Sequence, residues 1–385
     1  MKNIFLAGST GSIGKSAVDV ALSYPESLRV TGIAAGHYSS ELKKQVLRLK
    51  PAFCILSSKI EMEKAGRELK GLTKNGTVYL CGEEGMEEAV LRGNTDVVLN
   101  AISGSAGLLL SYRALEAGKD LALANKESMV MAGEVLNKIA KSRKAGIIPV
   151  DSEHSAVFQC LNCGKKNHLK KLILTASGGP FYKLPAGKFQ EITKDMALNH
   201  PKWKMGKKIT VDSATLANKG LEIIEAHFLF DVPEENIDVL IHPQAVIHSM
   251  VEFVDGSVIA QMGDTDMKGP IGYALSYPSR FKDLMKPLDI AGIRTLEFFK
   301  PDEKKFPFLN LARQALRTGK SMPAVFSEAN EFFVNLFLEN RISFTDIAKS
   351  VEKIMEKHTP FVLRTIDDVI EAKRQVHEFL KCYII

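Results

Sequence analysis

The feature that most constrains the fold is a glycine-rich segment close to the start of the chain. Gly8-Ser-Thr-Gly-Ser-Ile-Gly14 follows the apolar run Asn3–Ala7 and opens a helical pattern at Lys15–Ser23. Glycines allow a tight turn between a strand and a helix, and the amide groups at a helix N-terminus bind anions such as a pyrophosphate. The G-x-x-G-x-x-G spacing alone also fits an ordinary tight turn. Its place at the head of repeated strand–helix units favours dinucleotide binding.

Residues 1–150 alternate short apolar runs with segments of helical periodicity, which predicts a parallel sheet with helices on both faces. The expected strands are Asn3–Ala7, Arg29–Ala34, Phe53–Leu56, Val97–Ala101, Leu121–Ala124 and Ile147–Val150. The expected helices are Lys15–Ser23, Glu41–Lys50, Lys59–Leu69 and Ser128–Lys144. We therefore expect a Rossmann-like parallel-sheet domain over residues 1–150.

The rest of the 385-residue chain, which is longer than one core usually supports, has a different pattern. Residues 151–280 mix a glycine loop, a basic loop at 199–208 and three expected strands, Ile237–Ile241, Val246–Phe253 and Ser257–Met262, the last two joined by an Asp255-Gly256 turn. This pattern predicts a central α+β catalytic domain. Residues 281–306 are proline-bearing and aperiodic, so we expect a linker. Residues 307–385 predict a C-terminal helical domain, with capping boxes beginning at Ser343 and Thr365.

Composition narrows the classes of function and the expected location. The net charge is +6 with scattered basic residues, so nucleic acid is not an expected partner. No segment is long and apolar enough to span a bilayer, and no membrane partner is expected. The N-terminus runs straight into a strand, and the five cysteines are dispersed, which predicts a cytoplasmic protein. Cys160 and Cys163 form the only close pair, and we expect Cys160 to pack inside a helix rather than bind zinc.

Three acidic residues form the strongest candidate for a metal site. Asp151 and Glu153 follow the apolar run Ile147–Val150, and in extended chain they would point the same way. Asn218, Lys219 and Glu222 share one face of a helix if that segment is helical. Hard oxygen ligands beside amide and ammonium donors suit a divalent cation and a phosphorylated substrate. For the first pair alone, a solvated strand end is the simpler interpretation.

The segment after the second expected strand indicates which nucleotide binds. An NAD-specific site needs an acidic residue there for the ribose 2′-hydroxyl. The chain has Gly36-His37-Tyr38-Ser39-Ser40 instead, where His37 and the two serines could donate to a 2′-phosphate. This pattern favours NADPH. Asn125-Lys126-Glu127 ends a later strand, and we expect Lys126 to point towards the nicotinamide and the substrate.

Seven motifs together resemble those of the 1-deoxy-D-xylulose 5-phosphate reductoisomerase family, over nearly the whole chain. They are Gly-Ser-Thr-Gly-Ser-Ile-Gly at 8–14, Ala-Asn-Lys-Glu-Ser at 124–128, Asp-Ser-Glu-His-Ser-Ala at 151–156, Ala-Ser-Gly-Gly-Pro-Phe at 176–181, His-Pro-Lys-Trp-Lys-Met-Gly at 200–206, Asp-Ser-Ala-Thr-Leu-Ala-Asn-Lys-Gly-Leu-Glu at 212–222 and Ile-His-Pro-Gln-Ala-Val-Ile-His-Ser-Met-Val at 241–251.

The resemblance implies a metal- and NADPH-dependent enzyme of the methylerythritol phosphate route to isoprenoids, acting as a homodimer. It would rearrange 1-deoxy-D-xylulose 5-phosphate, a ketose phosphate, and reduce the product to 2-C-methyl-D-erythritol 4-phosphate. Asp151, Glu153 and Glu222 would bind Mg²⁺ or Mn²⁺, with Co²⁺ as a further candidate. The catalytic set would be these three with Lys126 and His200.

The resemblance also assigns the binding residues. The substrate-binding set is Ser152, Glu153, Ser177, His200, Trp203, Ser213, Asn218, Lys219 and Glu222, with His200 and Trp203 on a lid loop at 199–208. The cofactor-binding set is Ser9, Thr10, Gly11, Ser12, Ile13, Gly36, His37, Tyr38, Asn125, Lys126, Glu127 and Gly206. Two segments depart from the family: Gly36-His37-Tyr38 lacks the usual basic residue, and residues 101–105 are more polar.

Two other classes of protein share part of this pattern. A simple NAD(P)-dependent alcohol or semialdehyde dehydrogenase needs the glycine loop but neither the three carboxylates nor a phosphate pocket. A nucleotide-binding regulator without catalysis has no use for a hard-metal site. The residues leave open whether rearrangement is an α-ketol shift or a retro-aldol and re-aldol sequence, and whether His248 is structural or catalytic.

Overall fold

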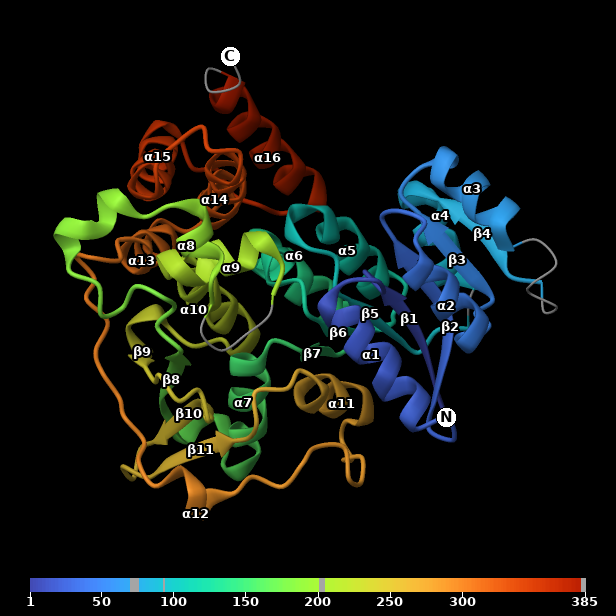
Figure 1. Cartoon of the computed structure of the whole chain (residues 1–385), viewed down its shortest axis with the longest axis horizontal. Coiled ribbons are helices and arrows are strands. Elements are labelled where there is room, and N and C mark those ends of the chain that lie inside the picture. Colours follow the sequence, from blue (N-terminus) through green and yellow to red (C-terminus); the bar gives the residue numbers. More distant parts are fainter. Residues whose placement is uncertain (70–75, 93, 201–204, 382–385) are drawn as a thin grey trace. The chain divides into compact units, whose positions relative to one another are not determined.

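The computed structural model describes residues 1–69, 76–92, 94–200 and 205–381 (Figure 1). Contacts divide the chain into two compact units. Unit 1 contains residues 1–125, 136–155 and 266–286, and unit 2 contains residues 126–135, 156–265 and 287–385. These units group the four expected ranges differently, because 266–286 packs in unit 1 while the central sheet and the C-terminal helices share unit 2.

Unit 1 is built on a seven-stranded parallel sheet of order β4-β3-β2-β1-β5-β6-β7. The strands are β1 (Lys2–Ala7), β2 (Leu28–Ala35), β3 (Phe53–Leu56), β4 (Val78–Cys81), β5 (Val97–Asn100), β6 (Asp120–Leu123) and β7 (Ile147–Pro149). The six expected strands and the Rossmann-like parallel sheet are confirmed. The edge strand β4 was not expected, although Val78–Cys81 is an apolar run of the same length as β3.

Three of the helices described in unit 1 follow the expected ranges, and three were not expected. They are α1 (Ser12–Ser23), α2 (Ser40–Leu49), α3 (Lys59–Leu69), α4 (Gly82–Arg92), α5 (Leu108–Glu116) and α11 (Lys268–Ser276). The helices α6 (Lys126–Arg143) and α7 (Ser152–Cys160) cross the boundary between the units. At the start of α2, the Ser39 hydroxyl accepts a hydrogen bond from the Leu42 amide at 3.2 Å, which caps the helix.

The segment that returns to unit 1 late in the chain packs against its first helix. Figure 1 shows α11 beside α1. The Tyr24 ring stacks on Phe281 with 4.2 Å between centroids, and the Tyr24 hydroxyl donates to the Lys282 carbonyl at 2.6 Å. Lys2 also donates to the Tyr277 carbonyl at 2.6 Å. Contacts of such long sequence separation explain why the sequence pattern did not assign residues 266–286 to this unit.

Unit 2 contains a four-stranded sheet of order β11-β10-β8-β9, in which only β8 and β9 are parallel. Its strands are β8 (Leu169–Ala176), β9 (Ile237–Ile241), β10 (Ile247–Phe253) and β11 (Val258–Met262). The expected turn between the last two is confirmed, with Gly256 at φ +83°. The expected mixed α+β pattern is therefore present.

The remaining helices described in unit 2 follow β8 in the sequence. They are α8 (Lys194–Leu198), α9 (Lys207–Thr215), α10 (Ala217–Phe230), α12 (Ile290–Ile293), α13 (Phe308–Thr318), α14 (Met322–Leu338), α15 (Phe344–Lys357) and α16 (Ile366–Leu380). Short 3₁₀ turns lie at Gly104–Gly107, Leu161–Cys163, Lys166–His168, Ala186–Glu191 and Glu234–Asn236. Both expected capping boxes, at Ser343 and Thr365, are present.

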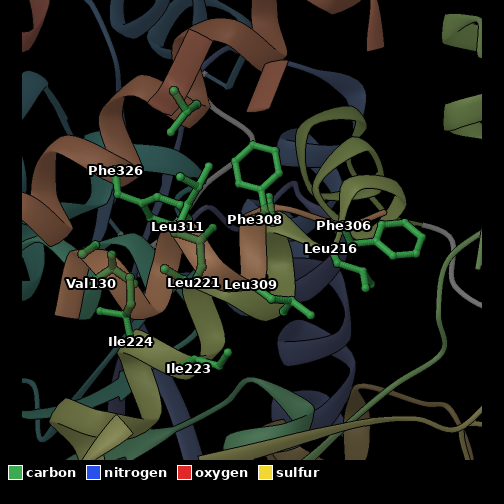
Figure 2. Packing of buried hydrophobic residues seen from close by; sticks show 14 of the residues in the cluster. Val130, Leu216, Leu221, Ile223, Ile224, Phe306, Phe308, Leu309, Leu311 and Phe326 are labelled. Carbon is green, nitrogen blue, oxygen red and sulfur yellow. The ribbon is translucent and has the colours of Figure 1, made fainter. Parts of the chain in front are cut away.

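The core of unit 2 fixes helix α10 in place (Figure 2). Leu221 and Ile224 of α10 are fully buried with Phe308 and Leu311 of α13. At Gly220 an added Cβ would lie 3.0 Å from the Phe308 carbonyl oxygen, so the absence of a side chain permits the close approach of the two helices. Packing of the apolar face of α10 in this core therefore fixes the position of the polar side chains on its other face.

Two smaller expectations are resolved by the fold. The aperiodic range 281–306 contains the short helix α12 and a backbone bridge between Ile241 and Phe299, so it is partly ordered by unit 2. Cys160 is buried at the end of α7 as expected, and burial raises the pKa of its thiol to about 11. Among the described residues, no helix combines the length and apolar character of a membrane span.

Candidate active site

The glycine loop forms a tight junction between β1 and α1. Gly8 has φ +77°, and the N-cap of α1 is Gly11. An added Cβ at Gly14 would lie 2.2 Å from the Gly8 carbonyl oxygen, so no larger residue fits without moving the loop. The loop follows β1, which pairs with both β2 and β5, where the strand order reverses. Open α/β sheets bind ligands at this switch point.

The polar residues at the neighbouring strand ends hold one another in place. The Asn125 amide donates to the Ile102 carbonyl at 2.6 Å and to the Gly104 carbonyl at 2.7 Å. The Asn100 amide donates to the Gly107 carbonyl at 2.8 Å. These bonds fix the loop after β5, which is the segment expected beside the cofactor.

The turn after β2 is contacted by a residue that the sequence pattern did not reveal, Glu61. His37 is 82% exposed, and its Nδ1 lies 3.8 Å from the Glu61 carboxylate. The Tyr38 amide donates to Glu61 at 2.6 Å. Glu61 belongs to α3, which follows β3 rather than β2, so no local spacing in the sequence connects it with residues 36–38.

Asp151 lies in a bend and Glu153 in the first turn of α7, so the expectation that the two acids point the same way from extended chain is wrong. Strand β7 ends at Pro149, its last residue paired with β6, and α7 begins at Ser152. The Ser152 hydroxyl donates to the Glu153 carboxylate at 2.5 Å. Fully buried His154 places Nδ1 3.5 Å from the Asp151 carboxylate. The sequence analysis did not identify His154 as a residue that orients the Asp151 carboxylate.

In unit 2, three expected residues converge on the carboxylate of a fourth. The fully buried Glu222 accepts from the Asn218 amide at 2.5 Å and from the Lys219 ammonium at 2.5 Å. The Lys126 ammonium lies 3.3 Å from Glu222 and donates to Asn218 at 2.8 Å. The expectation that Asn218, Lys219 and Glu222 share one helix face is confirmed. Two ammonium groups beside one carboxylate make this cluster cationic, which suits a phosphorylated ligand.

Ser177, His200 and Ser213 form a second polar cluster in unit 2. His200 Nε2 lies 3.2 Å from the Ser177 hydroxyl and 3.1 Å from the Ser213 hydroxyl. Burial lowers the pKa of His200 from its ordinary value. Ser213 lies in the last turn of α9 rather than in a loop, and Gly206 is the N-cap of α9. Trp203 lies outside the described residues.

A buried ion-pair network was missed by the sequence analysis. Lys208 of α9 donates to Glu127 of α6 at 2.6 Å and lies 2.9 Å from Asp212. Asp212 also accepts from the Asn330 amide at 2.8 Å. Burial alone would lower the pKa of Lys208, but Asp212 and Glu127 together raise it. Burial alone would raise the pKa of Glu127, but Lys208 lowers it. Both groups are therefore charged at neutral pH.

A parallel sheet of this strand order, a glycine loop at its switch point and a buried cluster of charged residues are the features of a dinucleotide-dependent oxidoreductase. Three family models match the chain. They are 1-deoxy-D-xylulose 5-phosphate reductoisomerase over residues 4–133, its C-terminal domain over 147–230, and a DXP reductoisomerase C-terminal domain over 262–379. The chain belongs to the 1-deoxy-D-xylulose 5-phosphate reductoisomerase family.

Curated relatives and solved structures agree with this assignment. The reductoisomerase of Geotalea daltonii is 49% identical over 96% of this chain and 96% of its own, and that of Chlorobaculum tepidum is 46% identical over 98% of each. A solved structure of the Zymomonas mobilis enzyme in complex with NADPH is 36% identical, with a TM-score of 0.90 over 99% of each chain. A second solved reductoisomerase, in complex with NADPH, fosmidomycin and magnesium, is 37% identical with a TM-score of 0.94, covering 99% of this chain and 98% of its own.

Proposed function

We propose that the chain converts 1-deoxy-D-xylulose 5-phosphate to 2-C-methyl-D-erythritol 4-phosphate, by a skeletal rearrangement followed by reduction with NADPH. The observation that supports this most is the buried Glu222 with Lys126, Lys219 and Asn218 in hydrogen-bond reach. A hydride-transferring enzyme without a phosphorylated, metal-chelating substrate would gain nothing from burying two lysines beside one carboxylate.

We propose that Asp151, Glu153 and Glu222 bind one divalent cation, Mg²⁺ or Mn²⁺. All three offer hard oxygen ligands, which is the donor set that such cations prefer. A cation there supplies Lewis-acid polarisation of the substrate carbonyl. His154 orients the Asp151 carboxylate, and Lys126 holds a positive charge where the substrate oxygens lie.

The substrate phosphate is assigned to Ser177, Ser213, Asn218 and Lys219, with Ser152 and Lys126 on the remaining oxygens. Lys219 is 2% exposed and also donates to the Thr175 carbonyl at 2.5 Å, so its ammonium is held at the strand end rather than free to rotate. His200 lies between the two serine hydroxyls and orients them. We assign Trp203 to a loop that covers the substrate and excludes water before hydride transfer.

NADPH is assigned to the loop at 8–14, the turn at 36–38, residues 125–127 and Gly206. The Gly11 N-cap and first turn of α1 present backbone amides for the pyrophosphate. Glu127 is held by Lys208, so its role towards the cofactor is to position the start of α6 and with it Lys126. A homodimer and a cytoplasmic location complete the proposal.

One assay tests the proposal against both alternatives. The chain is incubated with 1-deoxy-D-xylulose 5-phosphate, Mg²⁺ and NADPH, and absorbance of the reduced nicotinamide is followed. We expect oxidation that requires both the substrate and the metal. A simple dehydrogenase would turn over after chelation of the metal, and a regulator would bind NADPH without consuming it. Either result would contradict the proposal.

A further inference from the structure

The turn after β2 is held from one side by the junction between β3 and α3. The Ser57 hydroxyl donates to the Gly36 carbonyl. The Tyr38 amide donates to Glu61 Oε2 at 2.6 Å, and Glu61 Oε1 lies 3.8 Å from His37 Nδ1. Glu61 is only 21% exposed, whereas His37 is 82% exposed. A single carboxylate therefore contacts the backbone donor and the imidazole of the same short turn.

This turn is where a Rossmann-like domain distinguishes its two nucleotides. A carboxylate there accepts from the ribose 2′-hydroxyl of NADH and repels the 2′-phosphate of NADPH. The chain has no acid at the end of β2 itself, but Glu61 delivers one to the turn from α3. Its Oε2 also occupies the Tyr38 amide, a backbone donor that a 2′-phosphate would otherwise use.

We propose that Glu61 is a specificity-determining residue for the nucleotide: its carboxylate weakens NADPH binding and so lowers the preference of the site for NADPH over NADH. The inference rests on the proposed NADPH-dependent function and concerns which nucleotide the same site accepts. His37 is the one imidazole at the turn, and Glu61 competes with the 2′-phosphate for it. A cationic side chain also lies near the turn, because the Lys64 ammonium is 5.8 Å from the Tyr38 ring centroid.

The test replaces Glu61 with glutamine, which keeps an acceptor for the Tyr38 amide and removes the charge. Dissociation constants for NADPH and for NADH are measured on the full chain by nicotinamide fluorescence, at one pH and one ionic strength. We expect Glu61→Gln to tighten NADPH about threefold to tenfold, the effect of one charge on a nearby dianion in a partly screened site, and to leave NADH unchanged or weaker. Added salt should shrink the difference.

The matched control is Glu63→Gln, which removes the same charge from an exposed position on the same helix. We expect no change in the ratio of the two dissociation constants. NADH binding serves as an internal check of folding for both variants. An equal change for both nucleotides in Glu61→Gln, no change in either, or the same shift in Glu63→Gln would each overturn the inference. Wild-type chain that binds neither nucleotide would instead overturn the proposed function.

Discussion

At the scale of single residues, the site depends on charges that are held away from water. Glu222 is fully buried, and a buried carboxylate is tolerated only when paired groups compensate its lost hydration. The sequence predicted Asn218, Lys219 and Glu222 because helical spacing alone brings them together. It did not reveal Glu61 or Lys208, because folding brings them to partners that are distant in the sequence. It did not reveal the contact of His154 with Asp151, because that contact depends on α7 beginning at Ser152, where extended chain was expected.

Substitution of Glu222 by glutamine should separate turnover from nucleotide binding. We expect Glu222→Gln to lower kcat roughly a hundredfold or more, since one anionic ligand of the proposed cation is lost. The dissociation constant for NADPH should stay within about twofold, because Glu222 is not among the residues assigned to the cofactor. Steady-state kinetics and fluorescence titration measure the two quantities. Exposed Glu235→Gln is the control, and near-normal turnover of Glu222→Gln would remove Glu222 from the metal site.

The buried His200 should make stability fall in mild acid. Burial lowers its pKa in the folded chain below the unfolded value of about 6.5, so the unfolded state takes up a proton first. The contribution of His200 to stability is therefore complete above about pH 6.5 and decreases as pH falls through the folded pKa. Urea unfolding of wild type and His200→Gln at a series of pH values measures the pH-dependent contribution of His200 to the free energy of unfolding. A difference between them that does not change with pH would contradict the assignment.

At the scale of secondary-structure elements, local pattern predicted the strands and helices well and their partners poorly. Strand β3 and helix α3 have the expected bounds because an apolar run and a helical period are both local. The Asp151–Glu153 segment was assigned to extended chain, although β7 ends where its pairing with β6 ends. Contacts between α6 and α9 through Lys208 could not be read from either helix alone.

Removal of the Lys208 ammonium should destabilise the junction of α6 and α9. We expect Lys208→Met to lower the free energy of unfolding by about 3 kcal/mol, because two carboxylates lose their shared partner. We expect a loss of stability near the lower end of the range for a broken buried ion pair, because 17% of the Lys208 side chain is exposed to water. Chemical denaturation measures the change, with exposed Lys207→Met as the control. A loss of less than about 1 kcal/mol would place the pair among weak surface ion pairs.

The glycine loop gives a second prediction at this scale. Gly14→Ala places a methyl group 2.2 Å from the Gly8 carbonyl, so the junction of β1 and α1 must move. We expect NADPH binding to weaken by about tenfold or more, because the amides at the helix start no longer align with the pyrophosphate. Gly66→Ala on α3 has open space around its Cβ and is the control. Unchanged NADPH affinity in Gly14→Ala would exclude the loop from the nucleotide site.

At the scale of the whole molecule, the proposed metal site combines carboxylates that lie far apart in the sequence. Asp151 and Glu153 precede Glu222 by about 70 residues. The sequence motifs indicated three carboxylates for one cation, but periodicity is a local signal and could not by itself relate residues at this separation. The proposal therefore makes a statement about coupling between residues that are distant in the sequence.

Ligands of one cation must act together, so their substitutions should not add. We expect Asp151→Asn and Glu222→Gln each to weaken Mn²⁺ binding about tenfold to a hundredfold. The double variant should be little worse than either one, because a site that has lost one ligand gains little from the others. Electron paramagnetic resonance of free Mn²⁺ measures the affinities of the three variants and wild type, with Glu235→Gln as the control. If the two losses add in the double variant, Asp151 and Glu222 bind no common cation and the proposed site is wrong.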